Sequence, residues 1–239
     1  MTPVFEVYAV KYAHHRRRAA ENFIGGDPHD GPMPLDYFVW LVRGGGRELV
    51  VDTGFSAAVA AKRGRQHLRC PTEGLRLLGV DAASVKDVVI THLHYDHVGN
   101  FELFPEASFH LQDLEMRYAT GRYMGHECFR GAFEVDAELM PGVSVHLVGG
   151  HTMGLQVVRV ATRRGWVVLA SDAAHFYANM DEIRPFPIVY SVADMVEGYD
   201  KLRALADSRE HIIPGHDPLV LERYAAPSKA LQGIVARLD

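Results

Sequence analysis

The sequence predicts an α+β protein, with one domain over residues 1–239 in which mixed β-sheets pack with helices. Its length of 239 residues is enough to bury one substantial core. Hydrophobic residues make up 48% of the chain and charged residues 23%, which is ordinary for a globular protein. Short apolar segments alternate with segments of helical pattern, which indicates that strands and helices share this domain.

Strands are predicted where short apolar or alternating runs are bounded by turn residues. These runs are residues 4–10, 37–42, 48–51, 86–91, 143–148, 155–161, 166–170 and 211–213. Helices are predicted at residues 56–62, 71–78, 112–119, 192–205 and from 227 onward. The irregular stretch at residues 11–35 is long for a compact domain, and such loops usually have a function.

The composition and charge of the chain exclude several classes of partner. The net charge of −5 argues against nucleic acid, and the cluster from His14 to Arg18, which could bind an anion, lacks the aromatic residues that stack bases. No apolar run is long enough to span a membrane, and no basic segment precedes an apolar run at the start. With only Cys70 and Cys128, far apart in sequence, we expect a cytoplasmic protein with reduced, inert thiols.

Histidine is unusually frequent, and its most compact group indicates a metal site. Of the 14 histidines, His92, His94 and His97 lie within six positions together with Asp96. Residues two apart point in different directions on a helix, so a loop that leaves a strand is the arrangement that could make these side chains converge. Imidazole and carboxylate groups in this number suit zinc, or iron and manganese with less selectivity.

Three further residues share a position with His92, just past the end of a predicted strand. They are His151 after Gly150, Asp172 after Ser171, and His216 after Gly215. Each of these alone would be read as a turn or cap residue. Their common placement predicts a single site, because loops at strand ends collect side chains from distant parts of the sequence.

Taken together, these motifs resemble the metallo-β-lactamase superfamily. The resemblance rests on one run and four short motifs, which follow one another in the order of that family: Asp52-Thr53-Gly54, the run Thr91-His92-Leu93-His94-Tyr95-Asp96-His97, Gly150-His151-Thr152, Ser171-Asp172-Ala173 and Gly215-His216-Asp217. It implies a four-layer αβ/βα sandwich, in which two mixed sheets are flanked by helices and the metals lie at the edge between the sheets.

The resemblance also implies a ligand set for two divalent metal ions, with zinc as the expected metal. One ion would be held by His92, His94 and His151. The other would be held by Asp96, His97 and His216, and Asp172 would bridge the two. Asp52 would orient the first histidines through hydrogen bonds.

Within the superfamily, the motifs are most similar to those of the N-acyl homoserine lactonases, the quorum-quenching lactonases. Two positions depart from that pattern. Met153-Gly154-Leu155 stands where these lactonases have Pro-Gly-His, and His175 stands where many carry a tyrosine that holds the substrate carbonyl. Either His175 or Tyr177 could supply that hydrogen bond, so both are candidate catalytic residues.

The activity implied by this resemblance is hydrolysis of a small lactone or ester. A hydroxide that bridges the metals would attack the carbonyl, and Asp96 would pass a proton to the leaving oxygen. Residues 11–35 would form one wall of the substrate site, with apolar contacts from Phe23, Ile24 and Met33, and residues 176–190 would form the other.

Other interpretations remain open at this stage. The same site would suit another ester, lactone, thioester or phosphotriester. An iron oxidoreductase that acts on persulfides uses a similar ligand set with one metal, and a metal-binding sensor domain is a third option. Assembly as a homodimer is also left open by the sequence.

Overall fold

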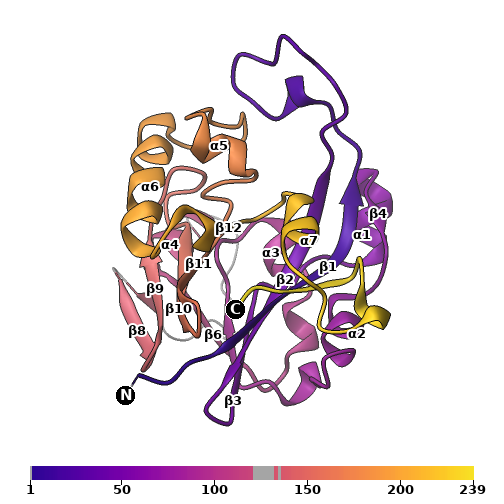
Figure 1. Cartoon of the computed structure of the whole chain (residues 1–239), viewed down its shortest axis with the longest axis vertical. Helices are drawn as coiled ribbons and strands as arrows, with labels where there is room; N and C mark the ends of the chain where they lie inside the picture. Colours follow the sequence, from indigo (N-terminus) through magenta and orange to yellow (C-terminus); the bar gives the residue numbers. More distant parts are fainter. Residues whose placement is uncertain (1, 121–131, 134–135) are drawn as a thin grey trace.

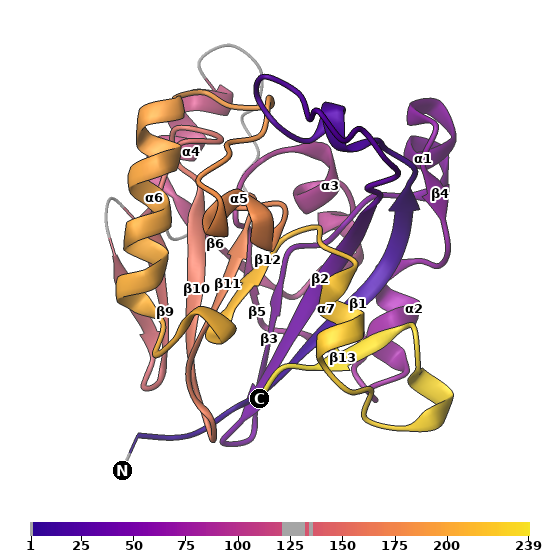
Figure 2. The same ribbon diagram turned by 45° about the horizontal axis from the view of Figure 1, so that its top comes forward.

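Two β-sheets packed face to face form the centre of the computed structural model, which describes residues 2–120, 132–133 and 136–239 (Figure 1). In Figure 2, helix α6 lies on one outer side of the molecule and helices α1 and α2 lie on the other, with the sheets between them. This is the four-layer sandwich that the sequence predicts, and the fold prediction is confirmed.

The first sheet is mixed and has eight strands. Its order is β13-β1-β2-β3-β5-β6-β7, and β4 pairs with β1 off this path. The bounds are β1 Glu6–His15, β2 Leu35–Gly44, β3 Arg47–Val51, β4 Gln66–His67, β5 Asp87–Val89, β6 Ser108–Gln112, β7 Ala132–Phe133 and β13 Val235–Arg237. Strands β1, β2 and β3 run antiparallel, whereas β3, β5, β6 and β7 run parallel.

The second sheet has five strands in the order β12-β11-β10-β9-β8. The bounds are β8 Ala137–Met140, β9 Val143–Leu147, β10 Gln156–Thr162, β11 Gly165–Ser171 and β12 Ile212–Pro214. Only the β11–β12 pair in this sheet is parallel. The parallel pair brings the ends of β11 and β12 to the same edge, where Asp172 and His216 follow.

The helices are short except for α6. Their bounds are α1 Ala57–Arg63, α2 Pro71–Arg76, α3 Tyr95–Val98, α4 Asp113–Thr120, α5 Tyr177–Asp181, α6 Val192–Leu205 and α7 Leu219–Arg223. Single 3-10 turns occur at Ala19–Glu21, Ala82–Ser84, Phe101–Leu103, Arg209–His211 and Lys229–Leu231. No helix in the described part of the chain has the length and apolar character that a membrane crossing requires.

The core divides in two because side chains alternate across the first sheet. On β1, Val7 and Ala9 face the second sheet, whereas Tyr8 and Val10 face the outer helices. Strand β2 follows the same period of two, with Trp40 in the core between the sheets. All of these side chains are buried, so the first sheet is packed on both faces and its edge supports the loops that leave it.

Two expectations about the elements were wrong. The chain from Pro227 onward does not form a closing helix, because after one 3-10 turn and Gly233 it extends into β13 and pairs with the edge of β1. The irregular stretch at residues 11–35 begins later than expected, since β1 continues to His15. Of the two cysteines, Cys70 is a free thiol and Cys128 lies outside the described residues.

Candidate metal centre

Four strand ends bring the predicted metal ligands to one place. Strand β5 leads to His92, and the loop between β9 and β10 carries His151. Strands β11 and β12 lead to Asp172 and His216. Glycine allows this convergence at Gly150, which has a φ of 87° and whose added Cβ would lie 2.6 Å from the α6 backbone at Met195.

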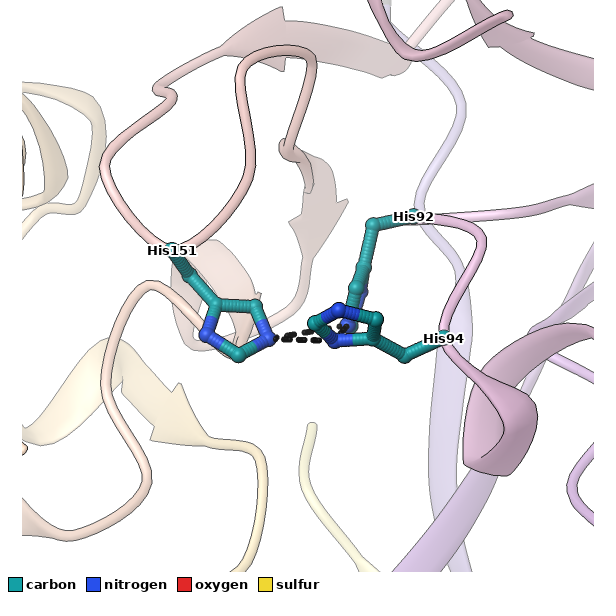
Figure 3. Close-up of side chains that lie close together, drawn as sticks. All are labelled: His92, His94 and His151. Carbon is teal, nitrogen blue, oxygen red and sulfur yellow. Dashed lines mark hydrogen bonds between the residues drawn. The ribbon is translucent and has the colours of Figure 1, made fainter. Parts of the chain in front are cut away.

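Three imidazoles meet in the first half of the cluster (Figure 3). His94 Nδ1 lies 3.1 Å from His92 Nε2 and 2.8 Å from His151 Nε2, and the Nε2 atoms of His92 and His151 are 3.1 Å apart. Figure 3 shows that the three rings come from two loops and turn their nitrogens toward a common point. Three imidazole nitrogens that face one point suit the coordination of a transition metal ion.

The carboxylate of Asp172 lies between two groups of histidines. Its Oδ2 atom lies within 3.9 Å of the Nε2 atoms of three of them: His92, His151 and His175. Its Oδ1 atom lies 3.0 Å from His216 Nε2 and 3.3 Å from His97 Nε2. One oxygen therefore faces each group, which is the arrangement expected of a carboxylate that bridges two cations.

The second half of the cluster is formed by Asp96, His97 and His216. Asp96 Oδ2 lies 3.8 Å from His97 Nε2 and 4.0 Å from His216 Nε2. Asp96 is partly exposed, whereas the two histidines are buried. The structure thus brings all seven predicted metal ligands together, in the two groups that the resemblance implied.

The donor atoms of this cluster fit a cation. His97 Nε2 and Asp172 Oδ1 are buried and have no hydrogen-bond partner among the described residues, although both face the cluster. His151 Nδ1 donates to the carbonyl of Ile188, and His216 Nδ1 donates to the carbonyl of Asp36. Because these Nδ1 atoms carry the proton, the Nε2 lone pairs face inward and are available to a metal.

The buried histidines of the cluster differ in the direction in which their pKa values are shifted. Burial lowers the pKa of His151 to about 3 and that of His175 to about 4, so both are neutral near pH 7. Burial alone would also lower the pKa of His97, but the carboxylates of Asp172, Asp52 and Asp96 raise it well above its usual value. A metal must displace the proton of His97, so metal affinity is expected to fall as the pH is lowered.

Asp52 orients two histidines of the cluster, His97 and His92, through hydrogen bonds. It has a φ of 61°, which aspartate tolerates better than most residues, and it is fully buried. Its Oδ2 accepts from His97 Nδ1 at 2.7 Å, and it also accepts from the Thr91 hydroxyl, which lies 3.2 Å from His92 Nδ1. Asp52 therefore contacts His97 directly and reaches His92 through Thr91.

Glu115 is a positioning residue that sequence reasoning missed. It lies on α4 and is 1% exposed. One carboxylate oxygen accepts from the backbone N–H of Leu93 and the other from that of Gly154, each at 3.0 Å. It thus joins the loop that carries His94 to the loop that carries His151. No motif marks it, because its partners are backbone groups far away in sequence.

Replacing Glu115 by glutamine is expected to loosen both loops. The amide keeps one acceptor oxygen but turns an NH₂ group toward the second backbone N–H, which leaves a buried donor without a partner. We expect unfolding free energy to fall by about 1–3 kcal/mol. Chemical denaturation measures this, with Glu102→Gln on the surface as the control. An unchanged stability together with an unchanged metal content would contradict this role.

The structure separates the two candidates for the catalytic hydrogen bond. His175 Nε2 lies 3.0 Å from Asp172 Oδ2, and its ring stacks on Phe186 with the centroids 3.5 Å apart. Tyr177 does not line the cavity above the cluster, and its ring lies under the Arg223 guanidinium on another face. Of the two, only His175 is placed beside the metal ligands.

A cavity of about 490 Å³ opens above the cluster. Five of the seven proposed metal ligands line it together with His175: His94, Asp96, His151, Asp172 and His216. The segment between β1 and β2, which rises above the sheets in Figure 1, contributes Arg17 and Glu21 to the lining. Leu35 at the start of β2 and Ile188 also line the cavity.

The expected wall residues Phe23, Ile24 and Met33 do not line this cavity. Phe23 is buried under the Arg184 guanidinium, Ile24 is exposed, and Met33 lines a separate hollow beside α7. The backbone hydrogen bond from Ile24 to Pro185 turns this part of the segment toward α5 instead.

Comparison with known structures supports the fold. A quorum-quenching N-acyl homoserine lactone lactonase superposes with a TM-score of 0.79 at 22% identity, covering 91% of this chain and 93% of that one. An N-acyl homoserine lactone hydrolase with the product N-hexanoyl-L-homoserine at its catalytic metal centre superposes with a TM-score of 0.81 at 20% identity, covering 95% and 98%.

Sequence comparison gives the family. The chain is 30% identical to the N-acyl homoserine lactonase AttM of Azorhizobium caulinodans, over 60% of this chain and 62% of that relative, which is less than two thirds of its length. It is 27% identical to AttM of Rhizobium radiobacter over 81% and 85%. The family model of the Metallo-beta-lactamase superfamily matches residues 33–216. The chain belongs to the metallo-β-lactamase superfamily, and its histidine and aspartate cluster has the donor groups of a divalent-metal site.

Proposed function

We propose that the chain opens lactone rings with two divalent metal ions, and that N-acyl homoserine lactones are its first candidate substrates. The observation that carries the proposal is the position of Asp172, whose two oxygens face two separate groups of histidines. Similarity to the AttM lactonases supports the choice of a lactone over other esters.

The ligand groups suggest which residues hold each ion. His92, His94 and His151 would hold one and Asp96, His97 and His216 the other, with Asp172 shared. Zinc is the proposed metal because neutral imidazoles and carboxylates are its usual ligands. Ions bound there supply Lewis-acid activation of a water nucleophile and of the ester carbonyl.

The residues of the chain position the substrate and move the proton. His175, whose Nε2 lies 3.0 Å from Asp172 Oδ2 in the lining of the cavity, would donate a hydrogen bond to the substrate carbonyl in place of the tyrosine that many lactonases carry. Asp96 is the partly exposed carboxylate of the cluster, and we assign it the delivery of a proton to the leaving ring oxygen. The side chains of Leu35, Leu93 and Ile188 contact the remainder of the substrate.

A panel of acyl homoserine lactones with increasing chain length tests the function. Ring opening releases acid, so a pH-stat follows it directly. We expect hydrolysis by the wild type and a roughly 10²–10⁴-fold lower kcat in Asp96→Asn, the usual contribution of a general acid. The control is Asp200→Asn, because the Asp200 side chain is 81% exposed and lies on α6.

Two outcomes would overturn different parts of the proposal. A protein that holds two zinc ions but opens no lactone of any chain length would refute the lactonase assignment and leave a hydrolase of another ester, thioester or phosphotriester. A protein with one iron ion per chain and no hydrolysis would favour the persulfide oxidoreductase.

A further inference from the structure

The rim of the cavity above the metal cluster carries an excess of positive charge. Arg17, Arg63 and Arg65 all line it. Arg17 faces Glu21, with Nε and Oε1 3.9 Å apart, so part of its charge is balanced. Among the described residues, no carboxylate forms a salt bridge with Arg63 or Arg65. Two guanidinium groups at the rim are therefore without a counter-charge from the described chain.

Both guanidinium groups are held by one aromatic residue. The Arg63 guanidinium lies over the Tyr95 ring, 3.8 Å from its centroid, and Arg65 Nε donates to the Tyr95 hydroxyl at 3.4 Å. Tyr95 immediately precedes Asp96 in α3. The cationic pair is therefore attached to the same short helix that presents Asp96 and His97 to the metals.

The end of helix α1 also fixes the positions of Arg63 and Arg65. Helix α1 ends at Arg63, and its C-cap Gly64, which has a left-handed φ of 66°, lies between the two arginines. Arg65 Nη1 then donates to the backbone carbonyl of Arg63 at 2.8 Å. Because both guanidinium groups contact Tyr95, their like charges repel each other, and a bound anion relieves that repulsion.

No other titratable group of the described rim balances this charge. Arg65 Nη1 donates to His15 Nε2 at 3.1 Å, and burial together with Arg65 and Arg17 lowers the pKa of His15 to about 4. His15 is thus a neutral acceptor at pH 7. The remaining carboxylates of the cavity, Asp96 and Asp172, face the histidine cluster.

We propose that the substrate of this site carries an anionic group, a carboxylate or a phosphate, that binds Arg63 and Arg65 while its scissile carbonyl lies over the metal cluster. Guanidinium groups recognise both anions through paired, charge-assisted hydrogen bonds. The inference rests on the proposed function, and it narrows the substrate from a neutral acyl lactone to one with a charged end.

The apolar residues of the cavity indicate what connects the anionic group of the substrate to its scissile carbonyl. Leu35, Leu93 and Ile188 line the cavity together with the cationic rim. Only these three lining residues are aliphatic, which suits a short aliphatic spacer rather than a long acyl chain, because charged, histidine and tyrosine side chains occupy the rest of the lining. A lactone or ester of a short dicarboxylic or phosphorylated acid combines these features.

Matched lactones test the proposal on the metal-loaded protein. N-hexanoyl-L-homoserine lactone is the neutral member, and its partners carry a terminal carboxylate (N-(4-carboxybutanoyl)) or phosphate (N-(4-phosphooxybutanoyl)). We expect the wild type to prefer an anionic member, and the ratio of kcat/KM for anionic over neutral substrate to fall roughly 10- to 100-fold in Arg65→Gln and in Arg63→Gln. The member preferred by the wild type identifies the anion as carboxylate or phosphate.

The control is Lys62→Gln, because Lys62 is an exposed cation of the same helix that does not line the cavity. It should leave the ratio unchanged. Arg63 is exposed, so its variant tests the proposal even where Arg65→Gln fails to fold. The preference should also shrink as salt concentration is raised. Equal kcat/KM for all three lactones in the wild type, or a preference that survives in both arginine variants, overturns the inference.

A binding measurement separates this inference from the proposed function. Calorimetry of glutarate and of inorganic phosphate with the metal-loaded protein needs no turnover. Weaker binding of one anion by roughly tenfold or more in both arginine variants, but not in Lys62→Gln, supports the inference even where no lactone is opened. Equal binding of each anion by all four proteins refutes it, whatever the lactone panel shows.

Discussion

Replacing Asp172 by asparagine is expected to lower kcat/KM by on the order of 10³-fold, at the upper end of what removal of one electrostatic contact costs an enzyme. The residue is 3% exposed and faces histidines with both oxygens. Asparagine keeps one oxygen but turns an NH₂ group toward the other side, which cannot bind a cation. We therefore expect loss of at least one metal ion, measured by elemental analysis beside the lactone kinetics.

The matched control for this change is Asp217→Asn. Asp217 is also buried, but it accepts hydrogen bonds from the backbone N–H groups of Tyr177 and Leu219. This variant should lose stability and keep its metal content. An Asp172→Asn protein that retained two ions and wild-type kinetics would show that the carboxylate does not bridge them.

Removal of the metals is expected to abolish hydrolysis and to lower the thermal unfolding midpoint. A ligand that binds only the folded state contributes about 4 kcal/mol at a concentration a thousandfold above its dissociation constant. For a chain of this size that corresponds to about 8–16 °C. The cluster predicts this effect, because without a cation His97 Nε2 and Asp172 Oδ1 stay buried without hydrogen bonds.

Scanning calorimetry before and after exhaustive chelation measures the shift. Added Zn²⁺ should restore both the midpoint and the activity, which excludes damage by the chelator. Activity that survives complete chelation, or an unfolding midpoint that does not move, would mean that the cluster binds no metal on which activity and stability depend.

The side chains that the structure brings together in the cluster could be predicted from the sequence because they lie in short motifs just past strand ends. The run from His92 to His97 places four candidate ligands within six residues, and His151, Asp172 and His216 each follow an apolar strand. A strand that is packed on both faces cannot shift, so the position of the residue that follows its end is nearly fixed.

The residues that surround the ligands could not be found in this way. Glu115 acts through backbone groups of Leu93 and Gly154, and neither contact leaves a mark in the sequence. The arginines of the rim are separated by Gly64, and both contact Tyr95 beside the cluster. Such contacts arise from tertiary packing, which a pattern in one segment does not encode.

The end of the chain shows the same limit in secondary structure. Residues from Pro227 have a local composition that suits a helix, yet Val235 pairs with Val10 at the edge of the first sheet. Pairing with an exposed sheet edge outweighs a weak helical preference. The expected cytoplasmic location, the expected lack of a nucleic-acid partner and the option of a homodimer stay predictions.

The metal content of the purified, active protein tests the central claim most directly. The position of Asp172 between two groups of histidines predicts two divalent ions per chain, with zinc as the metal. Elemental analysis of the protein at known concentration gives both the number and the identity of the ions. Two zinc ions per chain are the expected result, whereas a single iron ion per chain in fully active protein would contradict the account.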